Sequence, residues 1–233
     1  MNPPRRQQLK DLTHLLRSTL LLEKSFGIDS VAASGAVREK KSAPGDTLEN
    51  RMDCLSREVS VCVKCPLHRT RTRTVFGEGS LKAKLLFVGE APGSEEDRQG
   101  RPFVGQAGKL LTKIIEAMGM RREDVFIANV LKCRPPGNRS PLPEEIHSCE
   151  PYLIQQLESI RPRVICSLGK YATMVLLRKE EPISALRGNF YDYQGIPVLP
   201  TYHPAYLLRN PSAKKIVWED MKKIKAKLES LEA

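Results

Sequence analysis

The sequence lacks a long hydrophobic run. Hydrophobic residues make up 40% of its 233 positions, yet no apolar stretch approaches the roughly 18 residues that a membrane-spanning helix needs. The leucine-rich stretch over residues 20–22 is too short, and its neighbours are too polar, for the hydrophobic region of a secretory signal peptide. We therefore expect a protein that has no membrane segment and is located in the cytoplasm.

Acidic residues are scarce relative to basic ones. The chain has 27 Asp and Glu against 38 Lys and Arg, which gives a formal net charge of +11. Residues 1–50 hold eight basic and six acidic side chains, so most of the excess lies beyond residue 50. A basic globular region suggests a polyanionic partner, with nucleic acid as the first candidate, although a generic basic surface has the same composition.

Six cysteines in a cytoplasmic protein indicate metal binding or catalysis rather than disulfides. Cys62 and Cys65 form a C-x2-C pair, and Cys133 and Cys149 follow at a distance. Four such thiolates suit either zinc or an iron–sulfur cluster, and the spacing does not choose between them. The distant pair could also be unliganded. Cys166 lies inside an apolar run, where we expect a small core residue.

Short apolar runs bounded by turn residues predict buried strands. They cover residues 84–89, 125–130, 164–168 and 196–199, the last of these in a hairpin with residues 190–193. Amphipathic helical patterns alternate with the strands, and Gly119 is expected to end the helix that follows the first strand. This alternation predicts an α/β fold with a mostly parallel sheet and helices on both of its faces.

Four residues lie at or just beyond the carboxyl ends of these strands. They are Glu90, Asn129, Gly169 and His203. Because parallel strands end at one edge of a sheet, and ligands of open α/β sheets bind at that edge, one cleft could collect all four. Each residue taken singly could instead be an ordinary turn or cap residue.

The first 50 residues differ from the rest of the chain. Residues 5–26 carry leucines at helical spacing, which predicts an amphipathic helix, and residues 27–50 have the composition of a linker. We therefore expect an N-terminal extension over residues 1–50 and a globular domain over residues 51–233.

Arginine alternates with threonine directly after the C-x2-C pair. In an extended conformation Arg69, Arg71 and Arg73 share one side of the chain, as phosphate contacts would require. A solvated edge strand that is protected by charge has the same pattern.

Six motifs occur in order over about residues 57–228. They are the C-x2-C pair, VGEAPG, GRPFVG, ANVLKCRPP, the later spaced cysteine and HPAYLLRNP. Together they resemble the family 4 uracil-DNA glycosylases, the iron–sulfur type of bacteria and archaea. The resemblance implies a three-layer α/β/α fold with a central four-stranded sheet, in a monomer that excises uracil from DNA by hydrolysing its N-glycosidic bond. Residues 1–50 are not covered and could bind a replication or repair partner.

The resemblance also implies roles for individual residues. It places a structural 4Fe-4S cluster on Cys62, Cys65, Cys133 and Cys149, and so favours iron–sulfur over zinc. Its uracil-binding positions are Glu90, Ala91, Pro92, Phe103, Asn129 and His203, of which Glu90 and His203 are catalytic. Its DNA contacts are Leu207, as an apolar wedge, with Arg209 and Lys214 at phosphates.

Two other functions remain compatible with the sequence. A related glycosylase could act on hypoxanthine or another deaminated base. A non-catalytic, metal-stabilised DNA-binding module would keep the basic surface and the cysteines, but it would not need Glu90, Asn129 and His203 together.

Overall fold

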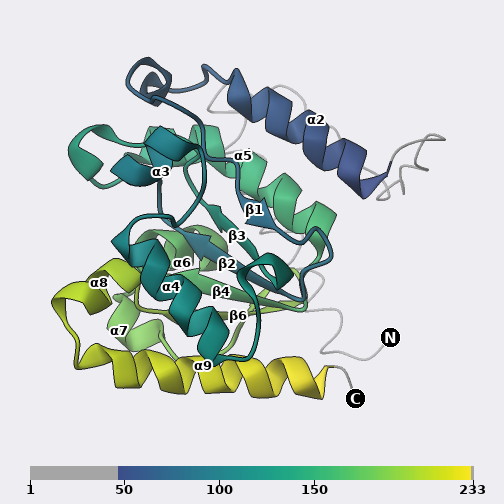
Figure 1. The fold of residues 1–233 in the computed structure, drawn as a ribbon, viewed down its shortest axis with the longest axis vertical. Coiled ribbons are helices and arrows are strands. Elements are labelled where there is room, and N and C mark those ends of the chain that lie inside the picture. The colour runs from purple at the N-terminus through teal and green to yellow at the C-terminus, as the bar shows by residue number, and fades with distance from the viewer. Residues whose placement is uncertain (1–46, 232–233) are drawn as a thin grey trace, which may run out of the picture. The chain divides into compact units, whose positions relative to one another are not determined.

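The computed structural model describes residues 47–231 (Figure 1). The helix expected over residues 5–26 and most of the linker expected over residues 27–50 lie outside this range. The first described helix, α2 (Leu48–Ser60), begins before residue 50, and the hydroxyl of Thr47 caps it by accepting a hydrogen bond from the Asn50 amide. No helix within residues 47–231 is long and apolar enough to cross a membrane.

A six-stranded sheet forms the middle layer, in the order β1-β3-β2-β4-β6-β5. Its four central strands are parallel, as expected: β3 (Phe126–Asn129), β2 (Leu85–Gly89), β4 (Val164–Leu168) and β6 (Ile196–Thr201). Two short antiparallel strands, β1 (Glu78–Gly79) and β5 (Tyr191–Tyr193), extend it at its edges. The sheet is thus wider than the four strands expected. The two-residue β1 is too short to leave a recognisable apolar pattern in the sequence.

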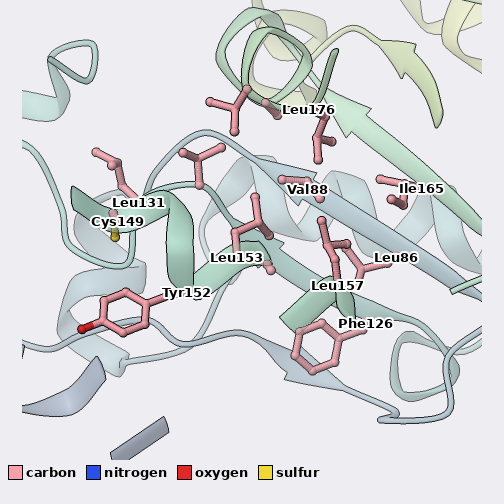
Figure 2. Packing of buried hydrophobic residues seen from close by; sticks show 14 of the residues in the cluster. Leu86, Val88, Phe126, Leu131, Cys149, Tyr152, Leu153, Leu157, Ile165 and Leu176 are labelled. Atoms are coloured by element: carbon pink, nitrogen blue, oxygen red, sulfur yellow. The ribbon is translucent and has the colours of Figure 1, made fainter. Parts of the chain in front are cut away.

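Helices cover both faces of the sheet, and β2, β3 and β4 are therefore buried throughout. Side chains alternate along a strand, so Leu86 and Val88 enter one core cluster while Leu85 and Phe87 enter the other. Figure 2 shows part of the first cluster, in which Leu153 and Leu157 face Leu86. Helices α2, α5 (Pro143–Ile160) and α6 (Lys170–Leu177) pack into this cluster; α4 (Gln106–Ala117), α8 (Pro204–Arg209) and α9 (Ala213–Ser230) pack into the other. The expected three-layer α/β/α fold is confirmed.

Shorter elements fill the connections. They are the helices α3 (Ser94–Gln99) and α7 (Ile183–Leu186) and the 3-10 turns η1 (Pro66–Arg69), η2 (Arg122–Asp124) and η3 (Pro136–Asn138). Gly119 ends α4 in the left-handed conformation, with φ of 82°, as the sequence predicts.

The parallel strands bring the expected functional residues to one edge of the sheet. Asn129 is the last residue of β3 and pairs in register with Gly89, which directly precedes Glu90. His203 follows the end of β6 by two residues. Gly169, after β4, lies against His203, since a β-carbon built there would be 3.1 Å from the His203 Cβ. The prediction that these strand ends share one edge is confirmed.

Candidate functional site

A cavity of about 430 Å³ opens at the carboxyl edge of the sheet. Six residues expected from the sequence line it: Glu90, Ala91, Pro92, Phe103, Asn129 and His203. Its remaining walls come from α3, α4, the loop after β3 and α8, through Gly93, Glu96, Ala107, Pro135, Asn138, Arg139, Ala205, Tyr206 and Arg209. We call this space the strand-end cavity. Its volume falls in the range of small-molecule sites.

Asn129 lines the strand-end cavity and carries an unpaired side-chain acceptor. The residue is 1% exposed. Within residues 47–231, its Oδ1 is the only buried side-chain nitrogen or oxygen that has no hydrogen-bond partner. Leaving a buried polar atom unpaired costs about 1 to 3 kcal/mol. The arrangement therefore favours a ligand that donates an N–H group to this oxygen.

Gly89 makes room for two of the cavity side chains. A β-carbon at this position would lie 2.3 Å from the Asn129 Oδ1 and 2.6 Å from the Phe103 Cζ. Both distances are far below van der Waals contact, so only glycine lets the amide and the ring reach their places. The positions of two groups that line the strand-end cavity thus depend on a residue that has no side chain.

Phe103 is held in an uncommon backbone conformation, with φ of 50°. The Glu96 carboxylate accepts hydrogen bonds from the next two amides, those of Val104 at 2.9 Å and Gly105 at 2.8 Å. Gly108 lies directly beneath the turn, because a β-carbon there would be 1.9 Å from the Phe103 carbonyl oxygen. These contacts fix the aromatic ring, which is 6% exposed, at the wall of the cavity.

His203 is arranged to donate a hydrogen bond from Nε2. It is the N-cap of α8, and its Nδ1 accepts a hydrogen bond from the Ala205 amide at 3.1 Å. Burial of the ring lowers the pKa of His203 to about 4, so the imidazole is neutral at physiological pH. With Nδ1 acting as an acceptor, the proton of the neutral ring lies on Nε2. The ring centroid is 5.5 Å from that of Phe103.

Glu90 supplies a carboxylate at the same edge. The side chain is partly buried, and burial raises the pKa of Glu90 above its ordinary value of 4.5. Its backbone carbonyl accepts a hydrogen bond from the Leu131 amide at 3.0 Å, which ties the start of this loop to the segment after Asn129. The strand-end cavity therefore combines an acceptor, a neutral N–H donor, an aromatic ring and a carboxylate.

A second, smaller cavity is lined by Cys62, Cys65, Cys133 and Cys149, which we call the four-cysteine site. Burial raises the pKa of the Cys65 and Cys133 thiols, and it raises the pKa of Cys149 to about 12. Within residues 47–231, no three His, Cys, Asp or Glu side chains are grouped as ligands of a single metal ion. A cluster separates its four cysteine ligands around several irons and needs no such single point.

Two N–H donors point at sulfur atoms of this site. The Arg71 Nη1 lies 3.2 Å from the Cys133 Sγ, and the Lys132 amide nitrogen lies 3.2 Å from the Cys149 Sγ. Such donors stabilise a negatively charged sulfur. A set of four cysteine sulfurs, two of which accept N–H hydrogen bonds, therefore fits the iron–sulfur cluster that the resemblance implies. Cys166 is fully buried in β4, as expected of a core residue.

The expected row of three arginines is wrong. Arg69 belongs to the 3-10 turn η1, so the segment is not extended throughout. Arg71 turns inward, where it donates to the Cys62 carbonyl at 2.7 Å as well as to the Cys133 sulfur. The prediction of one extended segment failed because nothing in the sequence shows that the Arg71 guanidinium lies beside the cysteines.

A family model described as the uracil DNA glycosylase superfamily matches residues 76–222. The chain belongs to this superfamily. A type-4 uracil-DNA glycosylase of Saccharolobus solfataricus is 49% identical over 190 residues, which are 78% of this chain and 88% of that protein.

Two further relatives show that the chain is more similar to a type-4 than to a type-5 enzyme. A type-4 uracil-DNA glycosylase of Thermotoga maritima is 50% identical over 184 residues, 77% of this chain and 96% of that protein. A type-5 uracil-DNA glycosylase of Pyrobaculum aerophilum is 32% identical over 164 residues, 61% of this chain and 72% of that protein. The predicted membership of the type-4 branch is confirmed.

The superfamily resemblance misplaced one residue. Leu207, expected as an exposed apolar wedge, is 1% exposed and belongs to the core cluster beneath α8. Its neighbours Tyr206 and Leu208 are 39% and 45% exposed. Counting four residues from the histidine gives a position in sequence. Packing against α4 and the core cluster decides which side of this short helix faces solvent. The wedge assignment to Leu207 is therefore wrong in this superfamily member.

Among the cavity residues that the sequence did not predict, three carry charged or amide side chains. Glu96 lies among other acidic residues of α3 and resembles a solvated surface side chain. Asn138 and Arg139 lie in the proline-rich loop, where Arg139 forms an ion pair with the fully buried Glu145 of α5 at 2.6 Å. The one sequence signal for this pair was an acidic residue, Glu145, in the first turn of a predicted helix. Because Glu145 is buried, it requires a basic partner nearby, and Arg139 is that partner.

Proposed function

We propose that this chain is a monofunctional uracil-DNA glycosylase of base excision repair. It flips uracil out of DNA and hydrolyses the N-glycosidic bond, releasing uracil and leaving an abasic site. The observation that carries the proposal is the unpaired Asn129 Oδ1 in the strand-end cavity. The names of the type-4 relatives give it independent support.

Base selection follows from the Asn129 amide. Its Oδ1 accepts from the N3–H of uracil, while its Nδ2 donates to O4. Cytosine presents an acceptor at N3 and a donor at its 4-amino group, so it leaves Oδ1 facing a lone pair. Phe103 supplies a stacking face that is worth about 1 to 3 kcal/mol and does not distinguish one base from another.

Bond cleavage places positive charge on the sugar and negative charge on uracil. The neutral His203 donates its Nε2–H to uracil O2, where the negative charge develops, as the donors of an oxyanion hole do. The Glu90 carboxylate faces the sugar, where it stabilises the cation or orients the attacking water. Neither role needs His203 to be protonated, in keeping with its lowered pKa.

Excision is expected to fall as the pH is lowered, with a midpoint above 4.5. Burial raises the pKa of Glu90 above this value, and the reaction needs its anion, so activity is lost as the pH falls through the raised pKa. The pKa of His203, about 4, predicts no loss centred at 6.5. Single-turnover rates from about pH 4 to about pH 8 test this. Glu90→Gln should be slower and should lack the acid limb, whereas a His-like midpoint in the wild type would contradict the assignment.

Double-stranded substrate requires the uracil to leave the stack, which costs a few kcal/mol. We propose Leu208, beside the cavity residue Arg209, as the group that fills the space left behind. Arg209 lines the strand-end cavity, and the exposed Lys214 and Lys215 begin α9. These cations are placed to hold phosphates near the flipped nucleotide.

Leu208→Ala should slow excision from duplex roughly tenfold or more while changing excision from a single strand little, because only the duplex must be unstacked. Leu207→Ala is the matched control. That change empties a core position, so it should lower the free energy of unfolding by about 2 to 5 kcal/mol. Equal losses on both substrates in Leu208→Ala would place the wedge elsewhere.

The four-cysteine site is proposed to hold a 4Fe-4S cluster on Cys62, Cys65, Cys133 and Cys149. The cluster would join the segment before β1 to the loop after β3 and to α5, which carries Cys149. The Arg71 guanidinium and the Lys132 amide would donate to its thiolates. All six cysteines are free of disulfides, so the four of this site are available as ligands. Iron and sulfide analysis, with the visible absorbance of the purified protein, tests it against zinc.

One assay tests the proposed activity. The purified chain is incubated with a uracil-containing oligonucleotide, and the product is then treated with alkali. Cleavage at the uracil position only after alkali, with free uracil released, is expected. Absence of alkali-labile sites in folded protein would overturn the proposal in favour of a binding module. Faster release of hypoxanthine than of uracil would assign the cavity to another deaminated base.

A further inference from the structure

Lys132 lies buried between the strand-end cavity and the four-cysteine site. Its side chain is 1% exposed, although lysine is rarely fully buried. The Nζ donates to the Asn129 carbonyl oxygen at 2.8 Å and to the Gln156 Oε1 at 2.7 Å. Gln156, also fully buried, donates in turn to the Phe76 carbonyl at 2.9 Å. The lysine therefore holds the last peptide of β3 to α5.

The backbone of the same residue reaches the cysteines. The Lys132 amide donates to the Cys149 sulfur at 3.2 Å, and its carbonyl accepts from the Val75 amide at 2.8 Å. Cys133 is the next residue in the chain. One residue thus contacts Asn129 on one side and the four-cysteine site on the other.

These contacts do not depend on the charge of the side chain. Burial lowers the pKa of Lys132 to about 8. The neutral amine still has two N–H groups, which match the two acceptors that Nζ contacts. An apolar side chain of similar length would fill the same volume without the cost of burying a polar group. Unlike an apolar side chain, the lysine donates a hydrogen bond that holds the Asn129 carbonyl in one direction.

We infer that Lys132 is a positioning residue that fixes Asn129 for base recognition and links this orientation to the four-cysteine site. The inference rests on the proposed uracil excision. The peptide that follows Asn129 is held at its N–H by the Gly89 carbonyl and at its C=O by the Lys132 Nζ. Without the lysine only the first of these bonds would remain, and the Asn129 amide would be held less firmly toward the base. The amide of Asn129 must point in one direction to distinguish uracil from cytosine, so the cost should appear in selectivity as well as in rate.

The test is a double-mutant cycle between Lys132→Met and Asn129→Ala, measured on uracil-containing duplex. Lys132→Met alone should lower kcat/KM roughly 10- to 100-fold, because the Asn129 carbonyl and the Gln156 Oε1 both lose their buried donor. In the Asn129→Ala background it should have little further effect, because the group it positions is gone. Losses that multiply in the double variant would overturn the inference.

Two controls separate positioning from general damage. The visible absorbance of the proposed cluster, measured per folded chain, should be the same in Lys132→Met as in the wild type. An activity that falls in proportion to this absorbance would overturn the inference. Gln156→Leu removes only one acceptor of Nζ, and should give a smaller loss of the same kind, which serves as the test if Lys132→Met does not fold. An inactive wild-type protein would instead refute the proposed function.

Discussion

Gly89→Ala is expected to abolish most uracil excision while leaving the fold in place. The new β-carbon would lie 2.3 Å from the Asn129 Oδ1 and 2.6 Å from the Phe103 Cζ. Both atoms are the ends of side chains, so the amide and the ring would move while the backbone stays. The two groups that recognise the base would be displaced together, and we expect a loss of about 10² to 10³ in kcat/KM, comparable to removing one preorganised donor.

Single-turnover excision and a thermal melt, measured on the same preparation, check this expectation. Gly119→Asn is the matched control, since no atom lies within 4 Å of a β-carbon there and asparagine tolerates the left-handed conformation. It should retain activity. A Gly89→Ala protein that excises uracil at the wild-type rate, or one whose melting temperature falls with its activity, would contradict the role given to Gly89.

His203→Ala is expected to lower kcat by about 10² to 10³, which is the effect of removing one oxyanion-hole donor. The Nε2–H acts on charge that develops only as the bond breaks, so binding of the uracil-containing strand should change much less than the rate. Measuring strand affinity and single-turnover rate separately tests this division.

A glutamine at position 203 provides a sharp comparison. Its side-chain N–H can reach the neighbourhood of the imidazole Nε2, so His203→Gln should recover part of the lost rate. Its amide does not titrate, so its pH profile should keep the acid limb assigned to Glu90. Full activity in His203→Ala together with complete loss in Asn129→Asp would contradict the division of roles between these residues.

The sequence predicted the parts of the site that depend on local patterns. The apolar runs before Glu90 and Asn129 indicate buried parallel strands, and the ends of such strands must share an edge. The same argument places His203 after β6. These predictions required only the order of residues along each strand.

The remaining parts depend on contacts between distant segments. Glu96 supports Phe103 by accepting from amides eight and nine residues away, and Arg71 meets a cysteine 62 residues away. Neither contact leaves a periodic signal. Leu207 was misassigned for a related reason, because the burial of a residue in a six-residue helix is decided by the elements packed beneath it.

The unpaired oxygen of Asn129 has a consequence for the end of the reaction. The N3–H that it recognises is distant from the bond that breaks, and free uracil carries the same N–H as the uracil nucleotide. If Asn129 binds uracil as proposed, this contact survives cleavage and also holds the released base. We therefore expect Asn129 to slow the departure of uracil rather than its arrival.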